Sequence, residues 1–396
     1  MNTRTLGTKL LTALPSPPSV IPASTDRSLP DPFAGEDPRG GTLRPSEVLV
    51  VLPALDEEQH IEACIRSLMV PRGWMTQATV VVADGGSGDA TREIVARLAQ
   101  EMPNIVLIDN PRRLQSAAVN AAVETVAGAG HAVMVRCDVH AVYPPGYVRD
   151  VARAVHQRGV ASVVTAMDAI GDCGVARASA WIVDTPLGSG GAAHRGGTRS
   201  GYVDHGHHAG FALDWFRRIG GYDPNFSHNE DAEYDIRLAR AGGRIWLEAG
   251  VRPAYLMRPT LRGLCRQYWN YGRGRARTVS KLAVRPRLRQ LIPAVNVVVL
   301  PLSMLIGLYW WPAAAWWVLY GVLLMSASVL CAIRLRSACG LLSGPALALM
   351  HLGWGLGFIR QLGVELVAGP RGLRAHRHRR TSTAPALPVG SKGHAQ

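Results

Sequence analysis

The sequence predicts an α/β domain with a mostly parallel sheet, followed by apolar segments long enough to cross a membrane. From residue 47 to residue 165, short apolar runs alternate with stretches of helical periodicity and short loops. This alternation is typical of a parallel sheet with helices on both faces. Near the end of the chain, residues 291–309, 312–333 and 341–359 are each apolar and long enough to span a hydrocarbon core of about 30 Å.

The elements of the α/β domain are expected in a regular order. Buried strands are predicted from short apolar runs at residues 47–52, 79–83, 105–108, 132–135 and 160–165. Helices are predicted between them at residues 56–70, 92–101, 114–127 and 147–157. The pattern fails over residues 171–208, where we expect loops that order around ligands. A short helix at 215–219, a helix from the Asn229 cap to residue 241 and a strand at 245–247 complete the domain.

Charge and composition limit the classes of protein. Charged residues make up 18 % of the 396 residues, the formal net charge is +14, and the six cysteines form no CxxC pair. These features exclude a wholly disordered chain, a coiled coil and a disulfide framework. The acid-free basic stretch at residues 258–289 lies directly before the first apolar segment, which favours an anionic membrane surface or anionic substrate. No nucleic-acid-binding motif is present, so nucleic acid is not an expected partner.

Five regions follow from these patterns. They are a disordered leader at 1–44, the α/β domain at 45–257, a basic amphipathic interfacial segment at 258–290, transmembrane helices at 291–360, and a basic, largely disordered tail at 361–396. Arg334 and Arg336 place the second apolar junction on the same side of the membrane as the basic segment. A third full crossing would place the arginines of the tail on the outer side of the membrane, against the usual charge distribution. The number of crossings, between two and four, is therefore left open.

Polar residues follow the predicted strands at the edge where parallel sheets bind ligands. Asp56 and Glu57 follow the first strand, and Asp84 precedes a glycine turn after the second. Asp84 can accept hydrogen bonds from a base or ribose, or it can only cap a turn. Asp138 and His140 follow the fourth strand. A carboxylate and an imidazole suit a divalent cation that bridges two phosphates, and the alternative is a solvated loop.

Two later motifs carry candidate chemistry. Glu230 and Asp231 open a helix, where Asp231 is either a cap or a general base that deprotonates a hydroxyl. Residues 267–277 combine aromatic side chains with Arg273, Arg275 and Arg277. Guanidinium forks suit a diphosphate leaving group, and attraction to a membrane surface is the alternative.

Taken in order, these motifs resemble glycosyltransferase family 2, whose members have the GT-A fold. The resemblance covers about residues 47–289. The matching stretches are residues 51–57, Asp84-Gly85-Gly86-Ser87 with Asp89 and Thr91, residues 138–140, residues 220–223, residues 229–233 with Arg237, and residues 267–275. Within the family the chain resembles the succinoglycan-assembly type of membrane glucosyltransferase, in which Asp-Gly-Gly-Ser, the stretch at residues 110–116 and Asp-x-His-Ala recur.

The resemblance implies roles for individual residues. Asp231 would be the catalytic base, and Asp138, with or without His140, would hold Mg²⁺ or Mn²⁺ on the diphosphate. The nucleotide sugar would be bound by Pro53, Asp56, Glu57, Asp84, Arg112, Asp138, Glu230, Arg273 and Arg275. Asp56, Gly85 and His140 depart from the residues common in the family, which leaves metal affinity and metal choice open. For His205, His207 and His208 we favour an acceptor-side or structural loop over metal ligation.

The implied activity is that of an inverting glycosyltransferase. It would move a sugar from a nucleotide-diphosphate donor such as UDP-glucose to a polyprenyl-diphosphate-linked acceptor in exopolysaccharide or cell-envelope glycan assembly. The protein would lie in the plasma membrane among its lipids, as a multi-pass protein with a cytoplasmic catalytic domain. A processive polysaccharide synthase is one alternative, although the family's processive Gln-x-x-Arg-Trp signature is absent. A membrane scaffold that binds nucleotide sugars without turnover is another.

Overall fold

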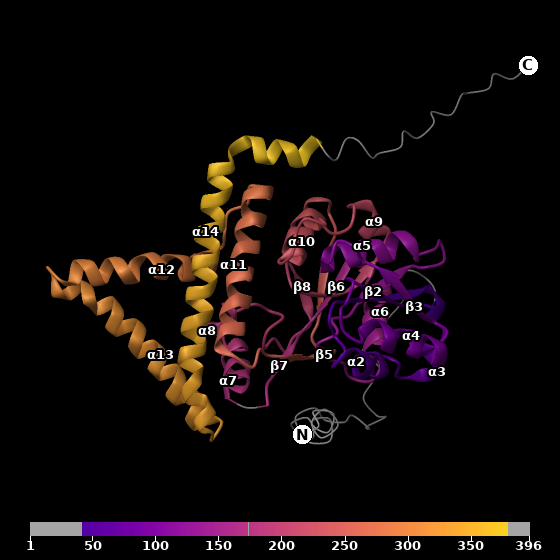
Figure 1. The fold of residues 1–396 in the computed structure, drawn as a ribbon, viewed down its shortest axis with the longest axis horizontal. Coiled ribbons are helices and arrows are strands. Elements are labelled where there is room, and N and C mark those ends of the chain that lie inside the picture. Colours follow the sequence, from indigo (N-terminus) through magenta and orange to yellow (C-terminus); the bar gives the residue numbers. More distant parts are fainter. Residues whose placement is uncertain (1–41, 173, 379–396) are drawn as a thin grey trace, which may run out of the picture.

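In a computed structural model, which describes residues 42–172 and 174–378, an α/β domain lies beside a group of long helices (Figure 1). A short helical turn, η1 (Pro45–Glu47), leads into the first strand. Most of the predicted leader and the part of the predicted tail after residue 378 lie outside the described residues.

The main sheet is mixed but mostly parallel, which confirms the predicted fold class. Among the described residues its order is β3-β2-β1-β4-β9-β6-β10-β8. The strands are β1 (Val48–Ala54), β2 (Thr79–Asp84), β3 (Ile105–Asp109), β4 (Val133–Arg136), β6 (Ser162–Thr165), β8 (Gly201–Val203), β9 (His207–Ala212) and β10 (Ile245–Glu248). Parallel pairs join β1 to β2 and β4, β2 to β3, and β6 to β10. β9 runs antiparallel between β4 and β6, and β8 is an antiparallel edge strand.

Helices cover both faces of this sheet, as the sequence predicts. One face carries α2 (Ile61–Leu68), α3 (Arg72–Met75), α4 (Thr91–Glu101) and α6 (Tyr147–Arg158). The other carries α5 (Gln115–Thr125), α9 (Leu213–Arg218) and α10 (Glu230–Arg240). In β1, Val50 and Leu52 pack on the first face, and Leu49 and Val51 pack on the second. Because both faces of β1 are buried, its sequence is continuously apolar rather than alternating.

The expectation of loops over residues 171–208 is only partly right, because residues 190–200 and 204–206 form loops and most of the other described residues do not. This stretch contains α7 (Gly174–Val183), α8 (Pro186–Ser189), β8 and the start of β9. β9 escapes prediction because its sequence, His-His-Ala-Gly-Phe-Ala, lacks a simple apolar pattern. Gly210 is needed there, since a Cβ at that position would lie 2.7 Å from side-chain carbons of Val151 and Val155 on α6. A small second sheet was also missed, in the order β5 (Ala141–Val142), β11 (Ala254–Leu256) and β7 (Asp168–Ile170).

The C-terminal region consists of long helices. They are α11 (Leu261–Leu282), α12 (Leu288–Gly307), α13 (Ala315–Arg334) and α14 (Ser343–His378), with the short turns η2 (Trp311–Ala314) and η3 (Ala338–Leu342). α11 runs beside α14, while α12 and α13 lead away and return to form a triangle with it (Figure 1). Within the described part of the chain, three segments have the length and composition to cross a membrane: Leu288–Gly307, Trp311–Arg334 and Ala338–Val367. α14 continues past the predicted boundary at residue 360, where Gln361 donates a hydrogen bond to Glu365 one turn on.

Glycines allow α11 and α14 to approach closely. A Cβ on Gly357 of α14 would lie 2.2 Å from the carbonyl oxygen of Trp269 on α11. A Cβ on Gly272 of α11 would lie 2.0 Å from the carbonyl oxygen of Trp354 on α14. Backbone atoms cannot move aside as a flexible side chain can, so any residue larger than glycine must push the two helices apart.

We therefore expect Gly357→Ala to destabilise the protein by about 1–3 kcal/mol, the usual cost of overpacking. The matched control is Gly363→Ala in the same helix, where a Cβ would meet nothing within 4 Å. That change should be neutral or stabilising, because alanine is the better helix former. Apparent melting temperatures of the detergent-purified variants measure both effects. Equal melting temperatures for the two variants would contradict the close helix approach.

Candidate active site

The ends of β1 and β2 are joined by hydrogen bonds that use the predicted acidic residues. Asp84 is fully buried and accepts hydrogen bonds from the Gly86 amide at 3.0 Å, the Ser87 hydroxyl at 2.5 Å and Arg92 at 2.8 Å. Burial works against its charge, but these donors outweigh burial and lower the pKa of Asp84. Asp56 accepts a hydrogen bond from the Gly88 amide at 2.8 Å. The two loops thus form one rim at the carboxyl edge of the sheet.

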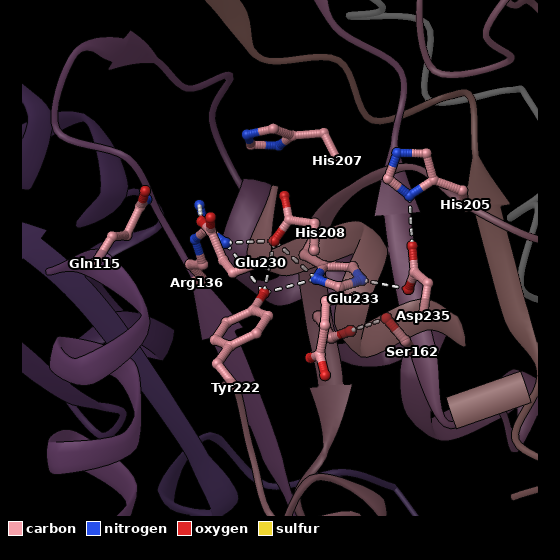
Figure 2. A network of polar contacts seen from close by, with 12 residues as sticks. Gln115, Arg136, Ser162, His205, His207, His208, Tyr222, Glu230, Glu233 and Asp235 are labelled. Atoms are coloured by element: carbon pink, nitrogen blue, oxygen red, sulfur yellow. Dashed lines mark hydrogen bonds and ion pairs between the residues drawn. The ribbon is translucent and has the colours of Figure 1, made fainter. Parts of the chain in front are cut away.

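A buried arginine gathers the other predicted acidic residues. Arg136, at the end of β4, lies 2.7 Å from Asp231, 3.4 Å from Asp138 and 3.5 Å from Glu230. It also donates a hydrogen bond to the Tyr222 hydroxyl at 3.0 Å (Figure 2). Burial alone would disfavour the charge, but the three carboxylates raise the pKa of Arg136, so it stays cationic. Arg136 therefore brings together the end of β4 and the start of α10.

Asp231 is clamped at one oxygen only. Its Oδ1 accepts hydrogen bonds from Arg136 at 2.7 Å and from Tyr222 at 2.9 Å, and lies 3.0 Å from Nδ1 of His208. Its Oδ2 has no protein partner among the described residues, and the side chain keeps 16 % of its exposure. Burial opposes the charge, but Arg136 and His208 outweigh it and hold the pKa of Asp231 well below its usual range. The carboxylate is therefore ionised, with one oxygen free to accept a proton.

Glu230, the neighbour of Asp231, is in the opposite state. Its side chain is buried, and burial, reinforced by the charge of Asp231, raises the pKa of Glu230 to about 7. Two adjacent carboxyl groups whose pKa values are driven apart can serve different purposes. Here Asp231 remains a carboxylate while Glu230 is readily protonated.

Two of the three clustered histidines extend this network. His208 is fully buried, and its Nε2 lies 2.6 Å from Oδ1 of Asp235, whose Oδ2 is 2.7 Å from Nδ1 of His205 (Figure 2). Burial would lower the pKa of His208, but Asp235 and Asp231 raise it to about 10. His208, in the strand β9, is thus a buried imidazolium that lies against Asp231.

The surroundings of Asp138 differ from those expected. Its Oδ1 accepts a hydrogen bond from Gln115 at 2.5 Å, and its Oδ2 lies 3.1 Å from Nε2 of His207. His140 instead faces Glu57, with Nδ1 3.7 Å from the Glu57 carboxylate. Against the effect of burial, Arg136 and His207 hold the pKa of Asp138 well below its usual range. The imidazole in contact with Asp138 therefore belongs to His207, which lies far from it in sequence.

A cavity of about 930 Å³ opens onto this cluster. Of the predicted site residues, Asp138, His140, Glu230, Asp231 and Arg275 line it. The remaining predicted residues, Pro53, Asp56, Glu57, Asp84, Arg112 and Arg273, lie outside it. The structure thus groups the predicted catalytic and metal residues in one cavity and leaves four of the nine predicted nucleotide residues, Pro53, Asp56, Glu57 and Asp84, on the neighbouring rim of the sheet.

The arginines predicted to act together on a diphosphate point in different directions. On α11, Arg275 lies two residues from Arg273 and from Arg277 and therefore does not share their helix face, whereas Arg273 and Arg277 are one turn apart. Arg275 lines the cavity, whereas Arg273 donates to Gln361 at 3.4 Å and Arg277 donates to the Asn225 carbonyl at 3.2 Å. Arg112 donates to the Asn225 side chain at 3.3 Å. Of the two arginines assigned to the leaving nucleotide, only Arg275 is placed to meet a ligand in the cavity.

Side-chain types and fold together define a class of protein. Carboxylates lie at the carboxyl edge of a mostly parallel sheet, beside a cavity rich in arginine. This combination is that of nucleotide-sugar transferases with the GT-A fold.

Comparison with known proteins identifies the family. The family model described as "Glycosyl transferase family 2" matches residues 49–220. The succinoglycan biosynthesis protein ExoA of Rhizobium meliloti (strain 1021) is 41 % identical over 320 residues, which cover 81 % of this chain and 96 % of that protein. The chain belongs to glycosyltransferase family 2 and is a glycosyltransferase.

Two solved structures are similar to this chain to different degrees. The mannosyltransferase PcManGT from Pyrobaculum calidifontis, in complex with GDP-Man and Mn²⁺, matches with a TM-score of 0.51 and 18 % identity, over 81 % of this chain and 88 % of that one. S. aureus TarS 1-349 matches with a TM-score of 0.42 and 14 % identity, over 82 % and 92 % of the two chains. The match to PcManGT confirms the predicted GT-A fold.

Proposed function

We propose that this protein is an inverting glycosyltransferase that moves a sugar, glucose from UDP-glucose, to a polyprenyl-diphosphate-linked saccharide during exopolysaccharide assembly. The similarity to a succinoglycan biosynthesis protein along most of both chains supports the pathway. The observation that carries the chemistry is the clamped carboxylate of Asp231, whose Oδ2 is free beside the cavity.

In the proposed reaction Asp231 acts as the general base. Its Oδ2 takes the proton from an acceptor hydroxyl as that oxygen attacks the anomeric carbon of the donor. The bond between the anomeric carbon and the diphosphate oxygen breaks, and the nucleoside diphosphate leaves with the bonding electrons. A single displacement from the opposite face inverts the anomeric configuration. Arg136 and His208 keep the carboxylate ionised and fixed in direction.

The residues around Asp138 fit a divalent cation shared with the donor diphosphate. The described residues contain no group of three or more His, Cys, Asp or Glu side chains that would bind a metal by themselves. Asp138 and His207 nevertheless form a carboxylate–imidazole pair in the cavity wall, and diphosphate oxygens commonly supply the other ligands of Mg²⁺ or Mn²⁺. We infer that Asp138, with His207 or His140, would hold Mn²⁺ or Mg²⁺ when the donor is bound, and that the metal would supply positive charge beside the leaving diphosphate.

The apolar helices support a location in the plasma membrane, with the catalytic domain on the cytoplasmic side. Large apolar side chains cover the outer surfaces of α12 and α13. By contrast, half of the apolar stretch that includes α14 is buried inside the protein. Exposed tryptophans, Trp310 and Trp311, lie where α12 meets α13, as expected near a membrane interface. We infer that the α12–α13 hairpin enters the bilayer and that α14 joins it to the catalytic domain.

A donor panel tests the proposed function. Membranes that contain the protein are incubated with lipid extract, Mn²⁺ and one nucleotide sugar at a time, and release of nucleoside diphosphate is measured. We expect release from UDP-glucose alone, loss of release with EDTA, and recovery when Mn²⁺ is added back. Release from a different donor would overturn the assignment of UDP-glucose. Release that EDTA does not lower would overturn the metal, and tight donor binding without any release would favour a non-catalytic scaffold.

A further inference from the structure

The cavity changes character along its length. At the sheet edge its walls carry Asp138 and Asp231, and on the opposite side they carry residues of the C-terminal helices. The apolar members of that side are Ile292 and Pro293 of α12, Leu323 of α13, and Met350 and Trp354 of α14. One continuous cavity thus joins the carboxylate cluster to the helices that have the composition of membrane spans.

The wall between these two ends is strongly cationic. Arg195, Arg258, Arg266, Arg275 and Arg289 line it, and the described residues give none of the five a carboxylate ion-pair partner. Arg275 has no hydrogen bond within the described part of the chain either. Burial and the nearby Arg287 and Arg289 lower the pKa of Arg275 to about 10. Asp235 opposes this shift in part. Positive charges in one cavity wall repel one another, so an anion bound among them would be stabilised.

Two of these arginines, Arg289 and Arg195, line the cavity and are each held by neighbouring residues. Nη1 of Arg289 donates to the carbonyls of Gly190 and Gly191, both at 2.9 Å, which fixes the side chain over the loop after α8. Nη1 of Arg195 is buried without a partner, and its guanidinium carbon lies 5.1 Å from the centre of the Tyr255 ring. A rigidly held guanidinium with free donors suits bidentate binding of phosphate oxygens.

The register of α12 places a cation beside an apolar stripe. Arg289, Ile292, Pro293 and Asn296 line the cavity and follow the spacing of one helix face. Val295 and Leu302 are exposed away from it. An isoprenoid diphosphate has the same order of chemistry, with an anionic head next to an apolar chain.

We propose that this wall is the binding site for the lipid carrier of the acceptor, with Arg275, Arg289 and Arg195 on the carrier's diphosphate and its isoprenoid chain between α12, α13 and α14. This inference rests on the proposed function and names the acceptor site. It reassigns Arg275 from the leaving nucleotide to the acceptor. The saccharide on the carrier would then extend toward Asp231 at the other end of the cavity.

Binding of the carrier without turnover tests the site. The full-length protein in a neutral detergent is titrated with undecaprenyl diphosphate, and separately with UDP-glucose. Arg275→Gln and Arg289→Gln should each weaken undecaprenyl diphosphate binding about 10-fold or more, because each removes charged hydrogen bonds. Both should leave UDP-glucose binding unchanged. Arg285→Gln, an exposed arginine just before α12, is the matched control and should leave both unchanged. If Arg275→Gln does not fold, Arg289→Gln decides alone.

Three outcomes would overturn the site. The first is unchanged binding of undecaprenyl diphosphate by Arg289→Gln. The second is an equal loss of UDP-glucose binding, which would assign the arginines to the donor site. Competition by phosphatidylglycerol at the same concentration would show a general phospholipid site instead. The proposed function fails separately: a protein that binds undecaprenyl diphosphate through Arg289 but releases no nucleotide from any donor would keep this site and lose the activity.

Discussion

Asp231→Asn should lower the rate of sugar transfer about 10²- to 10⁴-fold, the contribution that a positioned general base usually makes. The amide can still accept hydrogen bonds at its oxygen from Arg136 and Tyr222, so the fold of the cluster is retained. What the amide cannot do is take a proton from the acceptor hydroxyl. Because donor binding needs no proton transfer, we expect the affinity for the nucleotide sugar to persist.

Two measurements separate these effects. Release of nucleoside diphosphate in the presence of acceptor reports transfer, and titration with the donor reports binding. The matched control is Asp214→Asn, an exposed aspartate in the first turn of α9, which should change neither. Full transfer by the Asp231 variant would remove Asp231 from the role of base. Loss of donor binding together with transfer would assign it to the donor site.

The parts of this fold that the sequence predicts are those specified by local pattern. β1, β2 and β4 are continuous apolar runs, and the turn after β2 is built from its own residues, so both are visible in short windows. Asp84 and Asp138 could be placed at one edge because parallel strands end together. Asp231 opens the helix α10 and was assigned through the family resemblance, and in the structure Arg136 brings it to Asp138.

The residues that escaped prediction depend on contacts between distant segments. His208 can be buried in β9 only because Asp235 and Asp231, on α10, compensate its charge. A strand that begins with two histidines gives no sign of this in its own sequence. Arg136 lies two residues before Asp138 and is visible in the sequence. A single arginine at a strand end nevertheless gives no sign that three carboxylates will surround it.

Spacing also misled where the backbone conformation was not known. Arg273, Arg275 and Arg277 look like one fork in an extended chain. In the helix α11, Arg273 and Arg277 lie one turn apart and both reach α14, at Gln361 and Glu365, whereas Arg275 faces the cavity. The role of a repeated charge thus depends on the periodicity of the element that carries it. For this reason Arg275, rather than the group of three, enters the candidate acceptor site.

Arg136→Met should be the most destabilising single change in the cluster, at about 3–5 kcal/mol, the usual cost of breaking a buried ion pair by removing one partner. Methionine fills a similar volume, so loss of packing is small. Asp231, Asp138 and Glu230 would then face one another in a buried site without the guanidinium that now lies within 3.5 Å of each. The free energy of unfolding of the detergent-purified protein, measured in urea, reports the loss of stability.

A surface arginine with a similar number of partners provides the control. Arg66 bridges Glu62 and Glu101, but its side chain and both partners are about 40 % exposed, and such pairs contribute at most about 1 kcal/mol. Arg66→Met should therefore change stability little. An equal effect of the two substitutions would show that burial does not determine how much Arg136 contributes to the free energy of unfolding.

The double variant Arg136→Met with Asp231→Asn distinguishes a lost attraction from an uncompensated charge. If the damage of Arg136→Met arises because Asp231 is left charged and buried, neutralising Asp231 should restore about 0.5–3 kcal/mol, the range of coupling between residues in contact. If the damage arises only from the loss of the hydrogen bonds to Tyr222 and Asp138, the second substitution should add to the first. Recovery of stability without recovery of transfer is the expected result, because the arginine that holds the base and the carboxylate that is the base would both be gone.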